Sequence, residues 1–381
     1  MNKEQRVRYV GWVKKGILAE CTLVALMAAL IISRPERGAE QSFSMNTLSI
    51  EEDYIKWVDF TITYEALCSA YDWDVKTHGT EHEINWVDLL AYTAARTGGT
   101  FDKTAMKTLE KAAKAISTGE VTMEELTEEL KYFSYYKEAY DAAIGGLVGE
   151  YQEECVDGTG NTTYQECYGL KGYFPLARGF EYSHYDDFGA GRSYGYKRRH
   201  LGHDMMGQIG TPIISVESGV VEALGWNQYG GWRIGIRSFD GKRYYYYAHL
   251  RQNYPYAEGL EVGSVVTAGD VIGYMGHTGY STKENVNNIE VTHLHWGLEL
   301  IFDESQKESN NEIWIDLYDL TRFLAKHTQQ AQKVGDTREW ARSSRIVDPA
   351  VEEYLAHRDA GFVPTPITGA DPDMEPEDGD T

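Results

Sequence analysis

The feature that most constrains the fold of this 381-residue chain is a series of short strand-like segments between residues 211 and 275. They alternate apolar and polar residues or run apolar throughout, and glycine-containing turns separate them, which is typical of β-strands. Asp240-Gly241 predicts a tight hairpin turn between two of them. The expected strands are Thr211–Val216, Val220–Gly225, Trp232–Ser238, Arg243–His249, Gly263–Thr267 and Val271–Met275. This part of the chain is therefore predicted to be all-β.

Several histidines lie before, within and after this β-rich region of the sequence. His200 and Asp204 lie four residues apart before it, His249 ends an expected strand, and His293 and His295 follow two residues apart. Residues two apart on a strand point to the same face. A hydrolytic zinc site needs three nitrogen or oxygen ligands, an open fourth position, and unligated histidines that move protons. These residue types supply such a site.

The motifs resemble those of the lysostaphin-like (LytM-type) zinc metallopeptidases, the duplicated-hybrid-motif endopeptidases of bacterial cell walls. The resemblance covers roughly residues 170–305. It rests on His200-Leu201-Gly202-His203-Asp204, Tyr247-Ala248-His249-Leu250 and His293-Leu294-His295-Trp296, together with the connecting fragments Gly269-Asp270-Val271-Ile272-Gly273 and Thr278-Gly279-Tyr280-Ser281. The chain departs from the family pattern at Trp296, where Phe is common, and at His277, and neither departure removes a ligand position.

The resemblance implies that His200, Asp204 and His295 bind one Zn²⁺ per catalytic domain. It implies that His249 and His293 activate water and donate protons. It also implies a mainly antiparallel, sandwich-like sheet with an open groove.

Four further residues near these motifs are assigned by their position. His203 would point to the opposite face of a strand from its neighbour Asp204, which disfavours His203 as a ligand. His203 and His277 are therefore expected to lie behind the site or at the surface. Tyr196 and Arg198 directly precede the first motif and are candidates for substrate binding.

The beginning of the chain has the pattern of an export segment. Lys14 and Lys15 precede an apolar run, Ile17–Ile32, that Glu20 and Cys21 interrupt. A basic flank before an apolar stretch places the N-terminus in the cytoplasm. We expect a single-pass anchor in the bacterial cell membrane, with the catalytic domain outside the cytoplasm. The run is shorter than the ~20 residues that span a bilayer, so a cleaved signal and secretion are the alternative.

Residues 51–151 have a helical pattern. Thr104–Ile116 is rich in strong helix formers, and Thr122-Met123-Glu124-Glu125 matches a capping box. We expect a small all-α domain that acts as a spacer or regulator and can bind a protein partner. Its acidic residues are interpreted as a solvated helical face, because a glycosidase pair is defined by the separation of two carboxyl groups in space.

Charge and cysteine content limit the partners further. The chain has 59 acidic and 36 basic residues and a formal charge of −23. A nucleic-acid partner is not expected, since it requires a basic patch, and an anionic wall polymer would have to be bound locally. Cys155 and Cys167 flank a turn-rich stretch and can close a disulfide loop in an extracytoplasmic protein, a pairing that the sequence leaves open.

The expected architecture is an α+β multidomain chain. Its parts are a basic end with a signal-anchor segment (1–37), a linker (38–50), a helical domain (51–151), the β-rich peptidase domain (152–305, loop-rich up to 199), a C-terminal helical extension (306–360) and an acidic, disordered tail (361–381). The expected function is zinc-dependent hydrolysis of peptide bonds in peptidoglycan stem peptides or cross-bridges. The alternative is a catalytically silent wall-binding or activator scaffold of the same family.

Overall fold

Five helices form the first described part of the chain. The computed structural model describes residues 54–193, 197–307 and 311–358. The expected membrane segment at 17–32 and the acidic tail lie outside these residues. The helices are α2 (Tyr64–Thr77), α3 (Trp86–Thr97), α4 (Lys103–Ser117), α5 (Met123–Thr127) and α6 (Phe133–Ile144), followed by the 3-10 helix η1 (Gly145–Leu147). Within the described ranges, no helix combines the length and the apolar character needed to cross a bilayer.

The starts of two helices follow directly from the sequence. Asp102 accepts hydrogen bonds from the backbone N–H groups of Thr104 and Ala105 at the start of α4. At the start of α5, Thr122 Oγ1 accepts from Glu125 N–H, while Glu125 accepts from Thr122 N–H. Each cap satisfies backbone donors that the first turn of a helix leaves without partners. The helix predicted at 104–116 and the capping box at Thr122 are both confirmed.

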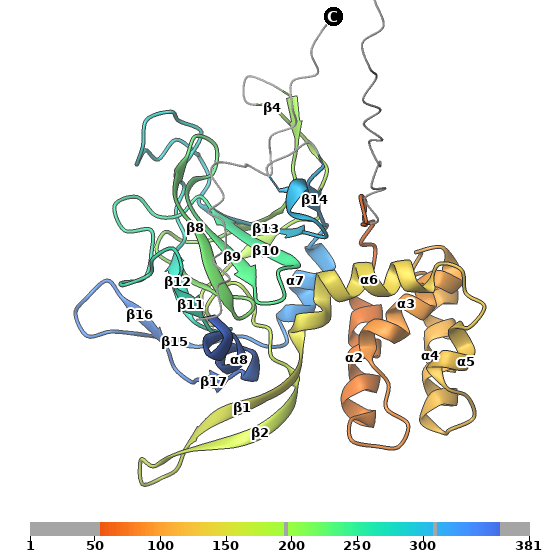
Figure 1. Cartoon of the computed structure of the whole chain (residues 1–381). Helices are drawn as coiled ribbons and strands as arrows, with labels where there is room; N and C mark the ends of the chain where they lie inside the picture. The colour runs from red at the N-terminus through yellow and green to blue at the C-terminus, as the bar shows by residue number, and fades with distance from the viewer. Residues whose placement is uncertain (1–53, 194–196, 308–310, 359–381) are drawn as a thin grey trace, which may run out of the picture. The chain divides into compact units, whose positions relative to one another are not determined.

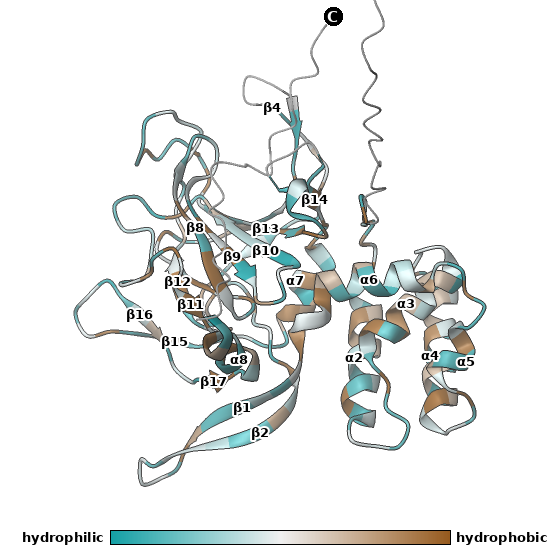
Figure 2. Ribbon diagram, viewed as in Figure 1, coloured by the Kyte–Doolittle hydropathy of each residue, from teal (hydrophilic) through white to brown (hydrophobic). Residues whose placement is uncertain are grey.

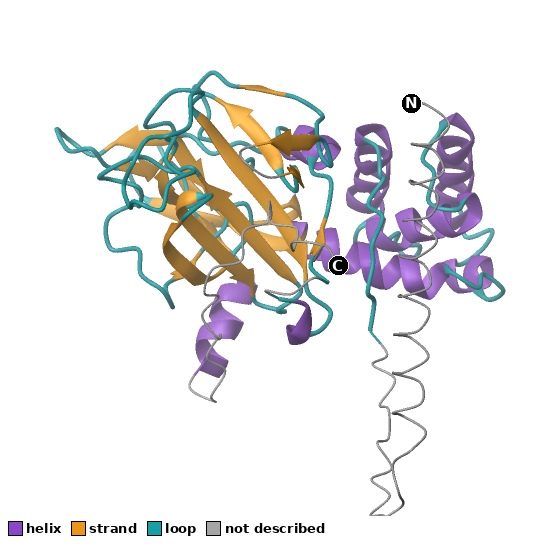
Figure 3. Ribbon diagram, turned by 90° about the horizontal axis from the view of Figure 1, so that it is seen from above, coloured by secondary structure: helices purple, strands orange, loops and turns teal. Residues whose placement is uncertain are grey.

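An eight-stranded sheet forms the centre of the β-rich part, with its strands side by side in Figure 3. The strand order is β11-β8-β9-β10-β13-β6-β3, and β14 pairs with β13. The strands are β3 (Ser183–His184), β6 (His203–Met206), β8 (Gly219–Asn227), β9 (Gly231–Ser238), β10 (Arg243–Ala248), β11 (Val265–Val266), β13 (His293–Leu300) and β14 (Ile313–Trp314). Every pairing between these strands is antiparallel. The mixed α+β class and the mainly antiparallel sheet are thus confirmed.

Smaller sheets and two helices complete the described chain. The two-stranded sheets are β7 (Pro212–Ile214) with β12 (Val271–Tyr274), β4 (Gly191–Ser193) with β5 (Lys197–Arg199), and β15 (Ala331–Lys333) with β16 (Trp340–Arg342). The remaining elements after the central sheet are η2 (Glu304–Gln306), α7 (Tyr318–Leu324), β17 (Ile346–Val347) and α8 (Pro349–His357). The segment expected as a helical extension therefore contains α7 and α8 and also short strands.

A long hairpin lies where the sequence predicts the end of the helical domain (up to residue 151) and then loops. β1 (Val148–Val156) and β2 (Thr162–Leu170) pair over their whole length (Figure 1), and β17 pairs with β1. The loop prediction was wrong here because most residues of both strands are polar, as the teal and pale ribbon in Figure 2 shows, so apolar alternation is missing. Asp157 organises the turn by accepting hydrogen bonds from Thr159 N–H and Asn161 N–H.

The register of this hairpin separates its two cysteines. Cys155 lies opposite Thr163, and Cys167 lies opposite Tyr151, which comes four residues before Cys155 on β1. A disulfide requires Cα atoms about 4.4–6.8 Å apart, which four residues of strand exceed. Both thiols are free, so the two cysteines are not bonded to each other.

A buried arginine connects the helices with the sheet. Arg243, the first residue of β10, donates to the carbonyl oxygens of Asp141 and Ala142 in α6. It also pairs with the Glu217 carboxylate through two nitrogens. The apolar core is continuous from the helices into the sheet, and the division into a helical and a peptidase domain stays a prediction.

Candidate active site

Strand register brings three separate pieces of the chain together. On β13, His295 lies opposite Asp204 of β6 on one side and opposite Ala248 of β10 on the other. His200 directly follows β5 and lies three residues before the first residue of β6, and His249 directly follows β10. The central position of β13 between β10 and β6 therefore explains why residues up to 95 positions apart can share one site.

His200, Asp204 and His295 form a candidate metal site. Each of these residues offers one possible ligand atom, and the three atoms all lie within 4.8 Å of one another. No other group of three such His, Cys, Asp or Glu residues is found within the described ranges. His200 Nε2 is 3.1 Å from Asp204 Oδ1 and 3.2 Å from His295 Nδ1, and these last two atoms are 2.9 Å apart. Tetrahedral zinc with ligand distances of about 2.0–2.2 Å separates its ligand atoms by about 3.3–3.6 Å, slightly more than these three distances. The three side chains therefore fit a single zinc ion.

The other ring nitrogen of His200 has an acidic partner. His200 Nδ1 lies 3.1 Å from Asp187 Oδ1 and 3.4 Å from the Asp187 carbonyl oxygen. Because both neighbours are acceptors, Nδ1 carries the proton and Nε2 keeps its lone pair for a metal. Arg192 completes the group, since its Nη2 donates to Asp187 Oδ2 at 2.7 Å and to Asp204 Oδ2 at 2.9 Å.

The sequence alone does not identify Asp187 and Arg192 as part of the site. They lie in a glycine- and aromatic-rich stretch that matches no motif of the resemblance. The two consecutive acids Asp186 and Asp187 were the available signal, but nothing in the sequence places Asp187 next to His200.

The electrostatics of the group favour an ionised Asp204. Burial raises the pKa of the Asp204 carboxyl, but the surrounding imidazoles, His293 first and then His200 and His295, outweigh it and hold that pKa well below its usual range. The pKa of Asp187 is also lowered, because its contacts with His200 and Arg192 outweigh its burial. Both acids therefore carry negative charge at neutral pH.

His249 and His293 lie beside the three candidate ligands. Their ring centres are 4.7 Å apart, and His293 Nε2 is 3.7 Å from Asp204 Oδ1. His249 Nδ1 donates to the carbonyl of Thr278, and His293 Nδ1 donates to the carbonyl of Val291. Each imidazole therefore keeps Nε2 free to accept a proton.

Both of these histidines are held neutral. Burial lowers the pKa of His249 well below the ordinary histidine value, and it lowers the pKa of His293 as well. His249 also adopts a left-handed backbone conformation, with φ of 60°. This conformation is unfavourable for a residue with a side chain, and such strain is concentrated at functional sites.

The remaining residues singled out from the sequence have different surroundings. Arg198 is buried, and its guanidinium lies 4.7 Å from the centre of the Tyr280 ring, which in turn lies 5.9 Å from the His249 ring. Tyr196 lies outside the described residues, and substrate binding by either residue stays a prediction. His203 lies opposite Trp296, where its Nε2 is 2.8 Å from His184 Nδ1. His277 Nδ1 donates to the carbonyl of Ile289.

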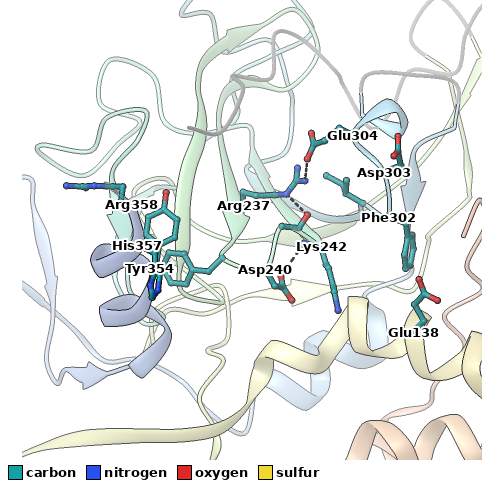
Figure 4. Close-up of a pocket in the computed structure, with 13 residues that line it drawn as sticks. Glu138, Arg237, Asp240, Lys242, Phe302, Asp303, Glu304, Tyr354, His357 and Arg358 are labelled. Atoms are coloured by element: carbon teal, nitrogen blue, oxygen red, sulfur yellow. Dashed lines mark hydrogen bonds and ion pairs between the residues drawn. The ribbon is translucent and has the colours of Figure 1, made fainter. Parts of the chain in front are cut away.

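A pocket of about 670 Å³ is lined by other residues than the candidate active site (Figure 4). Tyr354 and His357 of α8 and the following residue Arg358 line one side, and Phe302 and its neighbours line another. None of the five candidate site residues lines this pocket, so it is separate from the candidate active site.

Comparisons with known proteins relate part of the chain to a family of peptidases. Residues 198–310 match the model of peptidase family M23. The L-Ala–D-Glu endopeptidase of Bacillus subtilis is 35% identical over 161 residues, which are 42% of this chain and 46% of that enzyme. Lysostaphin of Staphylococcus simulans is 38% identical over 89 residues, or 23% of this chain and 17% of that protein.

The solved structure of the lysostaphin catalytic domain from Staphylococcus simulans is 30% identical to this chain. It covers 37% of this chain and 92% of that domain, with a TM-score of 0.28. The chain thus spans less than half the length of the two curated relatives described above. Residues 198–310 of this chain are a peptidase M23 domain.

Proposed function

We propose that this protein is a zinc-dependent endopeptidase that hydrolyses peptide bonds in peptidoglycan stem peptides or cross-bridges. The main support is that three acceptor atoms, one each from His200, Asp204 and His295, lie as close together as the ligands of one zinc ion. Two similar proteins support a peptide substrate: the L-Ala–D-Glu endopeptidase described above, and a glycyl-glycine endopeptidase of Staphylococcus capitis that is 36% identical over 89 residues.

The proposed chemistry divides the five residues into two groups. Zinc held by His200, Asp204 and His295 would supply a Lewis acid for the substrate carbonyl and would lower the pKa of water to about 7. His249 and His293 are neutral and keep Nε2 free. Either imidazole can take the proton of the attacking water and return it to the leaving amine, so no protein nucleophile is needed.

The test is digestion of peptidoglycan by the purified full chain. Two substrates, one directly cross-linked and one with glycine bridges, are needed because the similar proteins are named for different bonds. We expect new amino termini, without new reducing sugar ends, from at least one substrate. A chelator should abolish their release, and added zinc should restore it.

The same experiment distinguishes the scaffold alternative. A zinc-loaded chain that binds both peptidoglycans but releases no amine from either would contradict the endopeptidase and support a catalytically silent wall-binding protein. Release of reducing sugar ends would instead identify a glycosidase.

We also propose that the N-terminal segment anchors the protein in the cytoplasmic membrane, with the catalytic residues on the outer side. The basic flank at Lys14 and Lys15 and the apolar run from Ile17 support this orientation. Fractionation of cells that produce the full chain tests it. Recovery of a shortened protein in the medium would support signal cleavage and secretion instead.

A further inference from the structure

We propose that Asp187 and Arg192 are positioning residues that hold the candidate metal ligands His200 and Asp204 in place. Four charged or polar contacts link them in a closed ring: His200 to Asp187, Asp187 to Arg192, Arg192 to Asp204, and Asp204 back to His200. The inference rests on the proposed function in one respect, namely that His200 and Asp204 bind zinc.

The backbone around Asp187 is tied to His200. Gly189 N–H donates to the carbonyl of His200 at 2.7 Å, and His200 N–H donates to the carbonyl of Ala190 at 2.9 Å. Both backbone groups of His200, its N–H and its carbonyl, are therefore bonded to the segment that directly follows Asp187. This attachment places the Asp187 carboxylate next to Nδ1 of the ring.

Asp187 determines which nitrogen of His200 is available to the metal. A carboxylate at 3.1 Å from Nδ1 keeps the proton on that nitrogen and leaves the lone pair on Nε2, the atom that faces Asp204 and His295. The carboxylate also makes the imidazole a stronger donor to a metal. Without Asp187, the ring loses both its orientation and its fixed tautomer.

Arg192 has two opposing effects on metal binding. One nitrogen, Nη2, bonds to Asp187 Oδ2 and Asp204 Oδ2, so it fixes the Asp204 carboxylate with Oδ1 directed toward the two histidines. A guanidinium so close to a cation site also repels the metal, and the Asp187 charge compensates for this repulsion. Asp187 and Arg192 should therefore act as a pair.

Zinc affinity of the full chain, measured by competition with a chromophoric chelator, tests the pair without any peptidoglycan. We expect Asp187→Ala to weaken zinc binding about 10–100-fold, as for other outer partners of a metal-binding histidine. Asp187→Asn keeps an acceptor oxygen but not the charge, so this variant should lose less zinc affinity than Asp187→Ala. Arg192→Ala should also lose less than Asp187→Ala, because it removes a repulsive charge together with a hydrogen bond.

The double variant gives the sharpest outcome. In Asp187→Ala the Arg192 charge is left uncompensated, so removing Arg192 as well should restore part of the lost zinc affinity. A merely structural role predicts the opposite, namely that the second substitution weakens binding further. The unfolding midpoints of the metal-free variants should stay close to that of the wild type.

Arg322→Ala is the matched control. Arg322 also donates to an aspartate at 2.7 Å, Asp319, and its side chain is 38% exposed against 32% for Arg192. This control should keep the zinc affinity of the wild type.

Three results would overturn the inference. They are unchanged zinc affinity in Asp187→Ala, a double variant weaker than Asp187→Ala, and a loss of affinity matched by a loss of metal-free stability. Normal zinc binding without peptidoglycan cleavage would refute the proposed function and leave this inference standing. A wild-type chain that binds no zinc would overturn both.

Discussion

His295 and Asp204 lie directly opposite each other on β13 and β6, and His295 Nδ1 is 2.9 Å from Asp204 Oδ1 although 91 residues separate them in the chain. A shift of β13 by one residue would turn His295 to the other face of the sheet. The candidate metal site therefore depends on the register of one strand pair, and substitutions that disturb this pair should act on zinc binding first.

Gly202 packs against the pair from the segment between His200 and Asp204. A Cβ atom at this position would overlap with Cε1 and Nε2 of the His295 ring. Gly202→Ala should therefore displace the ring and reduce the rate of peptide cleavage about 100-fold, the cost of a misplacement of about 1 Å. Zinc content and cleavage rate are the measurements. Gly158→Ala, where a Cβ would meet no atom within 4 Å, is the control, and equal behaviour of the two variants would contradict the packing argument.

His249 and His293 should be required for turnover but not for zinc binding. Neither belongs to the group of converging ligand atoms, and each keeps an imidazole nitrogen for proton transfer. We expect His249→Ala and His293→Ala each to retain about one zinc per chain and to lose about 10²–10⁴-fold in rate. Loss of zinc from the His249→Ala variant would reassign that residue as a ligand.

Arg243 should dominate the connection between α6 and the sheet. Its guanidinium is buried against the Glu217 carboxylate and two carbonyl oxygens of α6. Removing one partner of a buried ion pair costs about 3–5 kcal/mol, so Arg243→Ala should lower the free energy of unfolding by that amount. The neighbouring Lys242 bonds to Asp141 of the same helix, but its side chain is 41% exposed, and Lys242→Ala should cost at most about 1 kcal/mol. Urea denaturation of both variants checks the difference, and similar losses would contradict it.

His327 should make the metal-free protein sensitive to acid. Burial lowers the pKa of its imidazole in the folded state, where Nδ1 donates to the carbonyl of Gly172. The unfolded chain then binds more protons once the pH falls below the ordinary histidine pKa of about 6.5, so stability decreases as the pH falls. The loss should be at most about 1.4 kcal/mol per pH unit relative to His327→Gln. Denaturation at pH 7.5 and 5.5 compares the two proteins, and parallel pH dependences would show that His327 does not contribute.

Local sequence signals predicted much of the fold because they depend on neighbouring residues. The turn at Asp240-Gly241 and the apolar alternation around it located β9 and β10, and the capping box at Thr122 located the start of α5. The β1–β2 hairpin could not be predicted in this way, because its strands carry many polar residues and only the last two residues of β2 are buried, so its pairing leaves no apolar pattern in the sequence.

The candidate site was predictable where spacing carries information. His293 and His295 share a face of β13, and Asp204 and His203 point to opposite faces of β6, as the period of a strand requires. The contacts of Asp187 and Arg192 depend on how one loop folds back on His200, and no local pattern encodes that return.

Zinc content and release of amino termini, measured on the purified full chain beside His295→Ala, test whether His200, Asp204 and His295 hold the zinc that peptide cleavage requires. We expect about one zinc per wild-type chain and cleavage of cross-linked peptidoglycan, with both lost in the variant. A variant that keeps its zinc, or a wild-type chain that cleaves without any, would contradict the assignment of His200, Asp204 and His295 as the metal site.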